Sequence, residues 1–164
     1  MGVDLIFKPV SIIVPIKNRG SLLPNLVRNL LKIDYPKFEV IIIDDNSTDG
    51  TKELLKKLHA SKKFSIRCIL LKKSVGSAKA RNIGIVKAKY DIIALTDSDC
   101  IVSKNWLKDL IPYLEKYDLI GGKVKYMDQA EDKMNPFQKI KKIISIKQNS
   151  LINFLNTNNL IFKR

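Results

Sequence analysis

The sequence predicts an α/β protein with a mostly parallel sheet and helices on both faces, a Rossmann-like arrangement. Short runs rich in valine and isoleucine alternate along the chain with segments whose apolar residues recur at helical spacing. These runs are almost uninterruptedly apolar, which is typical of parallel strands buried on both faces. The 164 residues are 45% hydrophobic, so the chain can bury one sizeable core, and a disordered or disulfide-stapled protein is excluded.

Strands and helices are expected to alternate over the first two thirds of the chain. A β-branched run predicts a strand over 10–16, and a helix follows it with Ser21 as its cap and Pro24 in its first turn. The elements expected next are a strand over 38–43, a helix capped by Ser47 or Asp49, a strand over 64–71, a helix over 77–88 and a strand over 91–96. We expect the first strand to be central, flanked by the strands that begin at Phe38 and Asp91.

The last third is less regular. A helix should begin at Ser103, and Pro112 inside it should kink or split it. Residues 118–126 are expected to form a fifth strand, after which the composition becomes polar and then predicts an amphipathic helix over 137–151. We therefore expect a core over 1–126 and a remainder over 127–164 that belongs to the same domain.

The net charge of +14 raises the alternative of a non-catalytic module that binds nucleic acid or an anionic membrane. The lysines are spread along the chain, however, and are not gathered into one block with aromatic residues, so we expect no nucleic-acid partner. A salt-sensitive shift on adding DNA would favour the alternative. The sequence has no apolar run long enough to span a bilayer and no metal-binding cysteine spacing, which indicates a cytoplasmic protein.

Acidic residues follow two of the expected strands directly. Asp44 and Asp45 come after the second strand, and Asp97 and Asp99 come after the fourth. Ligands of open α/β sheets bind outside the carboxyl ends of the strands, and two acids two residues apart point the same way from an extended segment. Asp97 and Asp99 therefore predict a site for Mn²⁺ or Mg²⁺, which would suit a diphosphate. The alternative is that both acids merely cap the helix after Ser103.

A complementary positive charge is expected beside these acids. Gly76 and Ser77 can open a helix whose free N–H groups favour an anion, and Arg81 lies in its first turns, where a guanidinium can pair with phosphate. Lys79 can add to this charge. The segment precedes the strand that delivers Asp97 and Asp99, which strengthens the prediction of a phosphate-binding site.

Four short strings in this order and spacing resemble the glycosyltransferases of family 2, which have the GT-A fold. The strings are Val14-Pro15-Ile16-Lys17-Asn18, Asp44-Asp45-Asn46-Ser47-Thr48-Asp49-Gly50-Thr51, Ala80-Arg81-Asn82-Ile83-Gly84, and Thr96-Asp97-Ser98-Asp99 followed by Trp106-Leu107. The resemblance covers residues 8–126, and residues 157–164 resemble a later segment of the family. It implies an inverting, metal-dependent transfer of a sugar from a nucleoside-diphosphate sugar to a saccharide, lipid-linked or protein acceptor.

The resemblance also implies the residues that bind the nucleotide sugar: Pro15, Asn18, Asp44, Asp45, Arg81 and Asp97. Pro15 and its neighbours would line the base, and Asp45 would accept a hydrogen bond from a base N–H with Asp44 in support. Arg81 would approach the diphosphate. Asp97 would face the ribose or a metal-bound water, and Asp99 would hold the cation on the diphosphate.

The family's general base lies beyond the segment that residues 157–164 resemble. The acids after the expected fifth strand are Asp128, Glu131 and Asp132, and we expect them in a solvated loop. The chain as given is therefore expected to lack the base, to bind the donor and to transfer sugar slowly. The stretch over 137–151 is expected to pack as a terminal helix, with peripheral membrane contact as the alternative.

Overall fold

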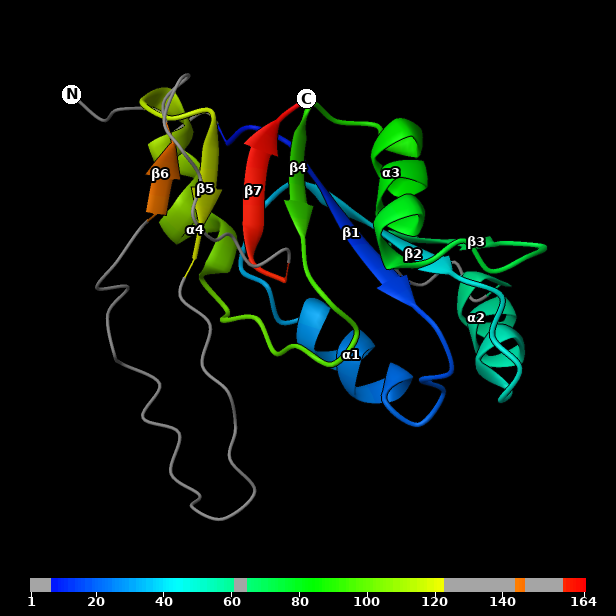
Figure 1. Cartoon of the computed structure of the whole chain (residues 1–164). Helices are drawn as coiled ribbons and strands as arrows, with labels where there is room; N and C mark the ends of the chain where they lie inside the picture. The colour runs from blue at the N-terminus through cyan, green and yellow to red at the C-terminus, as the bar shows by residue number, and fades with distance from the viewer. Residues whose placement is uncertain (1–6, 61–64, 123–143, 147–157) are drawn as a thin grey trace, which may run out of the picture.

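The computed structural model describes residues 7–60, 65–122 and 158–164 in full and the backbone of residues 144–146, and strands alternate with helices along it (Figure 1). The strands are β1 (Val10–Ile16), β2 (Phe38–Asp44), β3 (Ile66–Leu70), β4 (Ile92–Leu95), β5 (Leu119–Gly121), β6 (Ile144–Ile146) and β7 (Leu160–Lys163). The helices are α1 (Leu23–Leu30), α2 (Thr51–Ala60), α3 (Ser77–Lys87), α4 (Trp106–Leu110) and the 3₁₀ helix η1 (Ile111–Glu115). Within these ranges no helix has the length and hydropathy needed to cross a membrane.

All seven of these strands form one sheet in the order β3-β2-β1-β4-β7-β5-β6. The strands β1 to β4 are parallel, with Ile12 of β1 opposite Val40 of β2 and Ala94 of β4. The central position of β1 between β2 and β4 is thus confirmed. On the other side of β4, β7 runs antiparallel to both β4 and β5, and β6 runs antiparallel to β5. The sheet is therefore mixed, with a parallel and an antiparallel part.

Helices cover both faces of the sheet, as predicted (Figure 1). Alternate side chains of β1 point to opposite faces, so Ile12 and Ile13 belong to two separate apolar clusters. Leu26 of α1 and Leu107 of α4 pack into the cluster of Ile12, whereas Ala80 of α3 packs into that of Ile13. Burial on both faces explains why the strands of the parallel part are continuously apolar.

Of the two caps predicted for α2, Asp49 contacts its first residue and Ser47 does not cap it, and the cap predicted for α1 is wrong. The carboxylate of Asp49 accepts hydrogen bonds from the N–H (3.1 Å) and the hydroxyl of Thr51, whereas the Ser47 hydroxyl accepts the Asn18 N–H. Ser21 does not cap α1, because it lies in a turn in which the Leu22 N–H donates to the Arg19 carbonyl at 3.0 Å. Leu22 is the N-cap instead, with no side-chain hydrogen bond. Pro24 does lie in the first turn, as expected.

The helix predicted after Ser103 is split in two. Ser103 is not its cap, because the Ser103 carbonyl accepts the Trp106 N–H at 3.1 Å in a turn and α4 begins only at Trp106. The α-helical part ends at Leu110, and the 3₁₀ helix η1 carries Pro112 in its first turn. Proline has no N–H to donate and its ring collides with the preceding turn, which accounts for the predicted break.

The amphipathic helix predicted over 137–151 is wrong at Ile144–Ile146, which form strand β6. Two β-branched residues flank Ser145, and such residues favour a strand wherever a sheet edge supplies backbone partners. The edge of β5 supplies them here. The rest of the predicted helix, the boundary near residue 126 and the acids at 128, 131 and 132 lie outside the described residues.

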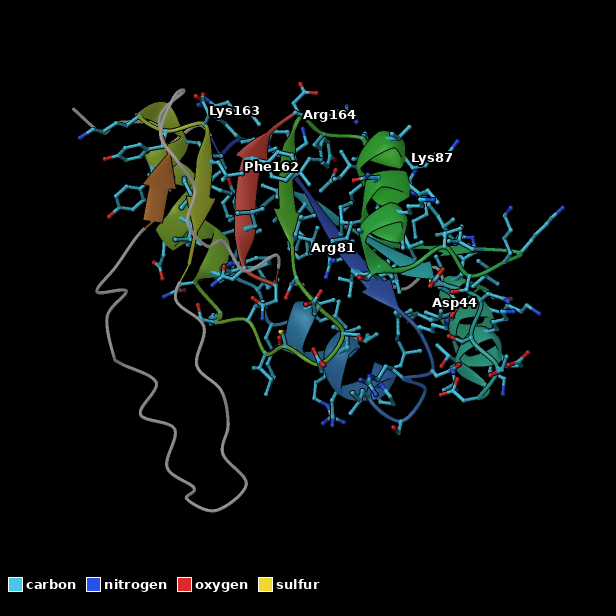
Figure 2. All side chains as sticks on the ribbon, viewed as in Figure 1. Asp44, Arg81, Lys87, Phe162, Lys163 and Arg164 are labelled. Atoms are coloured by element: carbon cyan, nitrogen blue, oxygen red, sulfur yellow. The ribbon has the colours of Figure 1, made fainter. Side chains whose placement is uncertain are left out.

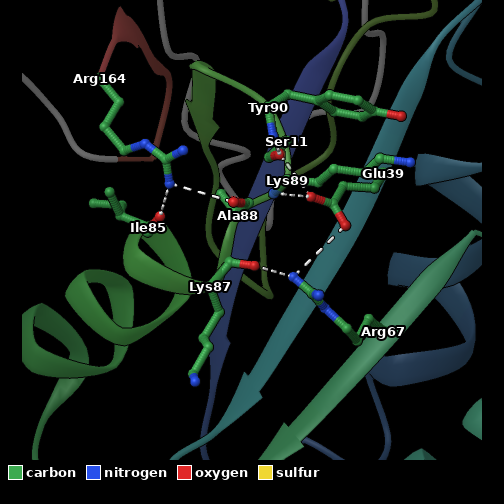
Figure 3. Close-up of polar contacts among 9 residues, drawn as sticks. All are labelled: Ser11, Glu39, Arg67, Ile85, Lys87, Ala88, Lys89, Tyr90 and Arg164. Atoms are coloured by element: carbon green, nitrogen blue, oxygen red, sulfur yellow. Dashed lines mark hydrogen bonds and ion pairs between the residues drawn. The ribbon is translucent and has the colours of Figure 1, made fainter.

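A polar network fixes α3 and the start of β4 at the end of the sheet where Lys87 and Arg164 lie, opposite to Arg81 (Figure 2). Glu39 accepts hydrogen bonds from the fully buried Ser11 hydroxyl (2.7 Å) and the Lys89 N–H (2.6 Å) (Figure 3). The guanidinium groups of Arg67 and Arg164 donate to carbonyls of the last turn of α3 and of the residue after it: those of Lys87, Ile85 and Ala88. These cations also complement the negative end of the helix dipole.

Candidate functional site

A cleft of about 380 Å³ lies at the carboxyl ends of the parallel strands. Its wall comes from segments far apart in sequence that parallel topology brings to one edge. The lining residues are Pro15, Ile16, Lys17 and Arg19 at the end of β1, Asp45 after β2, Ser74, Gly76 and Ser77 before and at the start of α3, Arg81 in α3, and Asp97, Ser98 and Asp99 after β4. The predicted convergence of Asp45, Arg81, Asp97 and Asp99 is therefore present in the structure.

The two acids after β4 have different surroundings. Asp97 forms an ion pair with Arg81, whose side chain is only 13% exposed. The Nε–H of Arg81 is buried and has no hydrogen-bond partner among the described residues. Asp99 has no cationic partner among those residues, and the thiol of Cys100 lies 3.8 Å from its carboxylate. Of these two acids, Asp99 is therefore the one that forms no ion pair with a described residue.

The donor atoms of this part of the cleft fit a hard divalent cation. Asp97 and Asp99 both line the cleft, and carboxylate oxygens are the ligands that Mg²⁺ and Mn²⁺ prefer. Two carboxylates fill only part of an octahedral coordination shell, so water and the oxygens of a bound ligand would complete it. A cation shared with a diphosphate agrees with this arrangement, since Arg81 supplies a second positive charge beside it.

The carboxylate of Asp45 organises the loop between β3 and α3. It accepts three hydrogen bonds, from the Val75 N–H (2.6 Å), the Ser74 hydroxyl (2.8 Å) and the Gly76 N–H (3.0 Å). The Ser74 hydroxyl also accepts a hydrogen bond from the Lys17 ammonium at 2.8 Å. Burial alone raises the pKa of Asp45, but these hydrogen bonds and the charge of Lys17 outweigh it and hold the pKa below its ordinary value of 3.8. Asp45 is therefore an anion at neutral pH.

Acid should destabilise the protein through Asp45. Because the pKa of this group is lower in the folded than in the unfolded chain, its stabilising contribution is complete above 3.8 and is lost as the pH falls through the folded value. We expect the melting temperature of the wild type to fall more steeply below about pH 4 than that of Asp45→Asn, which cannot titrate. Thermal melts followed by circular dichroism at several acidic pH values check this, and equal slopes for the two chains would contradict it.

Two of the expected nucleotide-binding residues do not line the cleft. Asp44 is fully buried, and its carboxylate accepts the Ser47 N–H at 3.1 Å. Asn18 has φ of +50°, a left-handed conformation that asparagine tolerates, and its side-chain oxygen accepts the Thr48 N–H at 2.8 Å. The Asn18 N–H donates to the Ser47 hydroxyl at 2.9 Å. Asn18 and Asp44 thus hold together the loops that follow β1 and β2.

Sequence reasoning did not assign roles to Lys17, Arg19 or Ser74, although all three line the cleft. Ser74 lies a few residues beyond β3, so the strand-end argument that found the acids could also have included it. Its hydrogen bond to Asp45 joins residues 29 positions apart. No local pattern indicates such a contact.

Comparison with known proteins assigns the chain to a sequence family. The model of the family described as Glycosyl transferase family 2 matches residues 11–163. Glycosyltransferase GlyG of Streptococcus pneumoniae serotype 4 is 33% identical over 120 residues, and AglE of Haloferax volcanii is 30% identical over 121. Each alignment covers 71% of this chain and 40% of the relative. The chain thus spans less than half the length of these relatives.

Solved structures agree on the fold. Staphylococcus aureus TarS 1-349 in complex with UDP-GlcNAc superposes with a TM-score of 0.65 at 28% identity, over 80% of this chain and 38% of that one. The mannosyltransferase PcManGT of Pyrobaculum calidifontis, in complex with GDP-Man and Mn²⁺, has a TM-score of 0.67 at 24% identity over 73% and 37% of the two chains, a likeness of fold. The expected GT-A fold is therefore confirmed, and because the family model covers nearly all of the sequence, the chain belongs to glycosyl transferase family 2.

Proposed function

We propose that this chain binds a nucleoside-diphosphate sugar together with Mn²⁺ or Mg²⁺, as the donor half of an inverting, metal-dependent glycosyl transfer. The observation that carries the proposal is that Asp45, Arg81, Asp97 and Asp99 line the same cleft. The cleft combines a buried hydrogen-bond acceptor with a guanidinium and two potential cation ligands. A base, a diphosphate and a cation require these three kinds of group.

The base and ribose would occupy the side of the cleft formed by Pro15 and Asp45. The Asp45 carboxylate accepts three hydrogen bonds from the loop between β3 and α3, and a carboxylate has about four acceptor positions, so one lone pair remains for a base N–H. Asn18 and Asp44 would act indirectly, since they fix the two loops from which Lys17 and Asp45 enter the cleft.

The diphosphate would lie between Arg81 and the acids after β4. Asp99 would hold the cation, with Asp97 as a second ligand or as the partner of the ribose or of a bound water. The cation, when bound, neutralises charge on the diphosphate that leaves the sugar. Arg81 would add a charge-assisted hydrogen bond to the same group. The roles proposed for these residues of the cleft are therefore roles in donor binding.

Isothermal titration calorimetry with UDP-GlcNAc and GDP-Man, each with Mn²⁺ and with EDTA, tests the proposal. These donors are the ones bound in the TarS and PcManGT structures. We expect one of them to bind more tightly with Mn²⁺ than without it. A titration with duplex DNA tests the alternative of a basic nucleic-acid-binding module, for which DNA would bind in a salt-sensitive manner and neither donor would bind.

Removing the Asp45 carboxylate, the proposed hydrogen-bond acceptor for the nucleotide base, should weaken nucleotide binding with or without metal. We expect Asp45→Ala to bind UDP or GDP roughly tenfold to a hundredfold less tightly, because a lost buried hydrogen bond costs on the order of 1–3 kcal/mol. Asp91→Ala is the matched control, since the Asp91 side chain is 86% exposed at the far end of the sheet. Calorimetry in EDTA measures the effect, and equal affinities for Asp45→Ala and the wild type would refute the role of Asp45.

A further inference from the structure

The loop that carries Asp97 and Asp99 is bound on one side by Asn29 of α1. The Val102 N–H donates to Oδ1 of Asn29 at 2.9 Å, and Nδ2 of Asn29 donates to the Val102 carbonyl at 3.3 Å. The two residues are 73 positions apart. The Asn29 amide thus uses one N–H and its oxygen to pair with both backbone groups of a single residue, as a neighbouring strand would.

Besides the ion pair of Asp97 with Arg81, backbone contacts hold this loop on either side of Asp99. The Cys100 N–H donates to the Asp97 carbonyl at 3.2 Å, and the Asp34 N–H that follows α1 donates to the Lys104 carbonyl at 2.8 Å. The Asp99 side chain itself has only the weak contact with the Cys100 thiol among the described residues. Its direction is therefore set by the backbone of the loop.

We infer that Asn29 is a positioning residue that holds Asp99 toward the cation site of the cleft. The inference rests on the proposed function, because it assigns Asn29 a role in that same metal site. Val102 lies three residues after Asp99, so its attachment to α1 fixes the loop close to the carboxylate. Without the amide, both backbone groups of Val102 lose their partner and the loop gains freedom at that point. Replacing a residue that orients a metal ligand typically lowers metal affinity by about tenfold to a hundredfold.

The test compares nucleotide affinity with Mn²⁺ and with EDTA, using UDP and GDP as probes. The ratio of the two affinities is the metal-dependent gain. We expect Asn29→Ala to reduce this gain by about tenfold or more while the affinity in EDTA stays within about twofold of the wild type. Asn29→Asp keeps the acceptor for the Val102 N–H and loses the donor, so it should give an intermediate gain.

Asn25→Ala is the matched control. Asn25 lies on the same helix, is exposed, and accepts a hydrogen bond only from Arg28 among the described contacts, so its substitution should leave the gain unchanged. An unchanged gain in Asn29→Ala, or an equal loss of affinity with and without Mn²⁺, would overturn the inference and leave the proposed function standing. A wild type with no metal-dependent gain would overturn both. If Asn29→Ala does not fold, Asn29→Asp decides: a wild-type gain contradicts the positioning role and a reduced gain supports it.

Discussion

The variant Asp99→Ala should lose the metal-dependent part of nucleotide binding. Of the two acids that follow β4, Asp99 has no cationic partner among the described residues, whereas Asp97 is already paired with Arg81. Removing it would leave the cation one carboxylate that is shared with a guanidinium. We expect the gain in affinity on adding Mn²⁺ to fall by more than about a hundredfold, since a direct ligand matters more than the groups that orient it.

Three measurements make this expectation specific. Affinity for UDP and GDP in EDTA should be unchanged in Asp99→Ala, because the base side of the cleft is untouched. Asp99→Asn keeps the shape and removes the charge, so it should lose most of the gain as well. Asp109→Ala, which removes an exposed carboxylate of α4, should behave as the wild type. A full gain in Asp99→Ala would show that the cation binds elsewhere.

The site could be predicted from the sequence to the extent that it follows from strand order. Asp45 and Asp97 each follow an apolar run, and in a parallel sheet the carboxyl ends of neighbouring strands meet at one edge. That rule needs only the alternation of strands and helices, so both acids were predictable without any knowledge of contacts. Arg81 was predictable in the same way, because α3 begins at that edge.

The contacts that fix these residues were not predictable. Ser74, which donates to Asp45, lies 29 residues after it, and Val102 lies 73 residues after Asn29. Hydrogen bonds of this kind arise from the packed structure and leave no periodic trace in the sequence. The helix prediction was wrong at Ile144–Ile146 for the same reason. Backbone pairing with β5 stabilises a strand there, although the sequence pattern is helical.

The position of Arg81 depends on how closely α3 packs on the sheet. Gly84 lies one turn further along the helix and faces β1 and β2. A Cβ at this position would lie 2.5 Å from Cγ2 of Ile13 and 2.7 Å from Cδ1 of Ile43, both fully buried side chains. Contacts this short require the neighbours to move, and the core around them is filled. The absence of a side chain at Gly84 therefore sets the distance between α3 and the sheet.

Replacing Gly84 by valine should lift α3 from the sheet and cause a large loss of stability. Overfilling a packed core costs typically 1–3 kcal/mol, and a Cβ with two methyl groups added against two buried isoleucines places this variant at the upper end, about 3 kcal/mol. For a chain of this size that corresponds to a fall in melting temperature of roughly 6–12 °C. Asn82→Val introduces the same side chain on the exposed face of α3 and should change the melting temperature by less than about 2 °C. Differential scanning calorimetry of both variants measures the contrast. Equal melting temperatures for Gly84→Val and Asn82→Val would contradict the view that the close contact between α3 and the sheet positions Arg81 at the cleft.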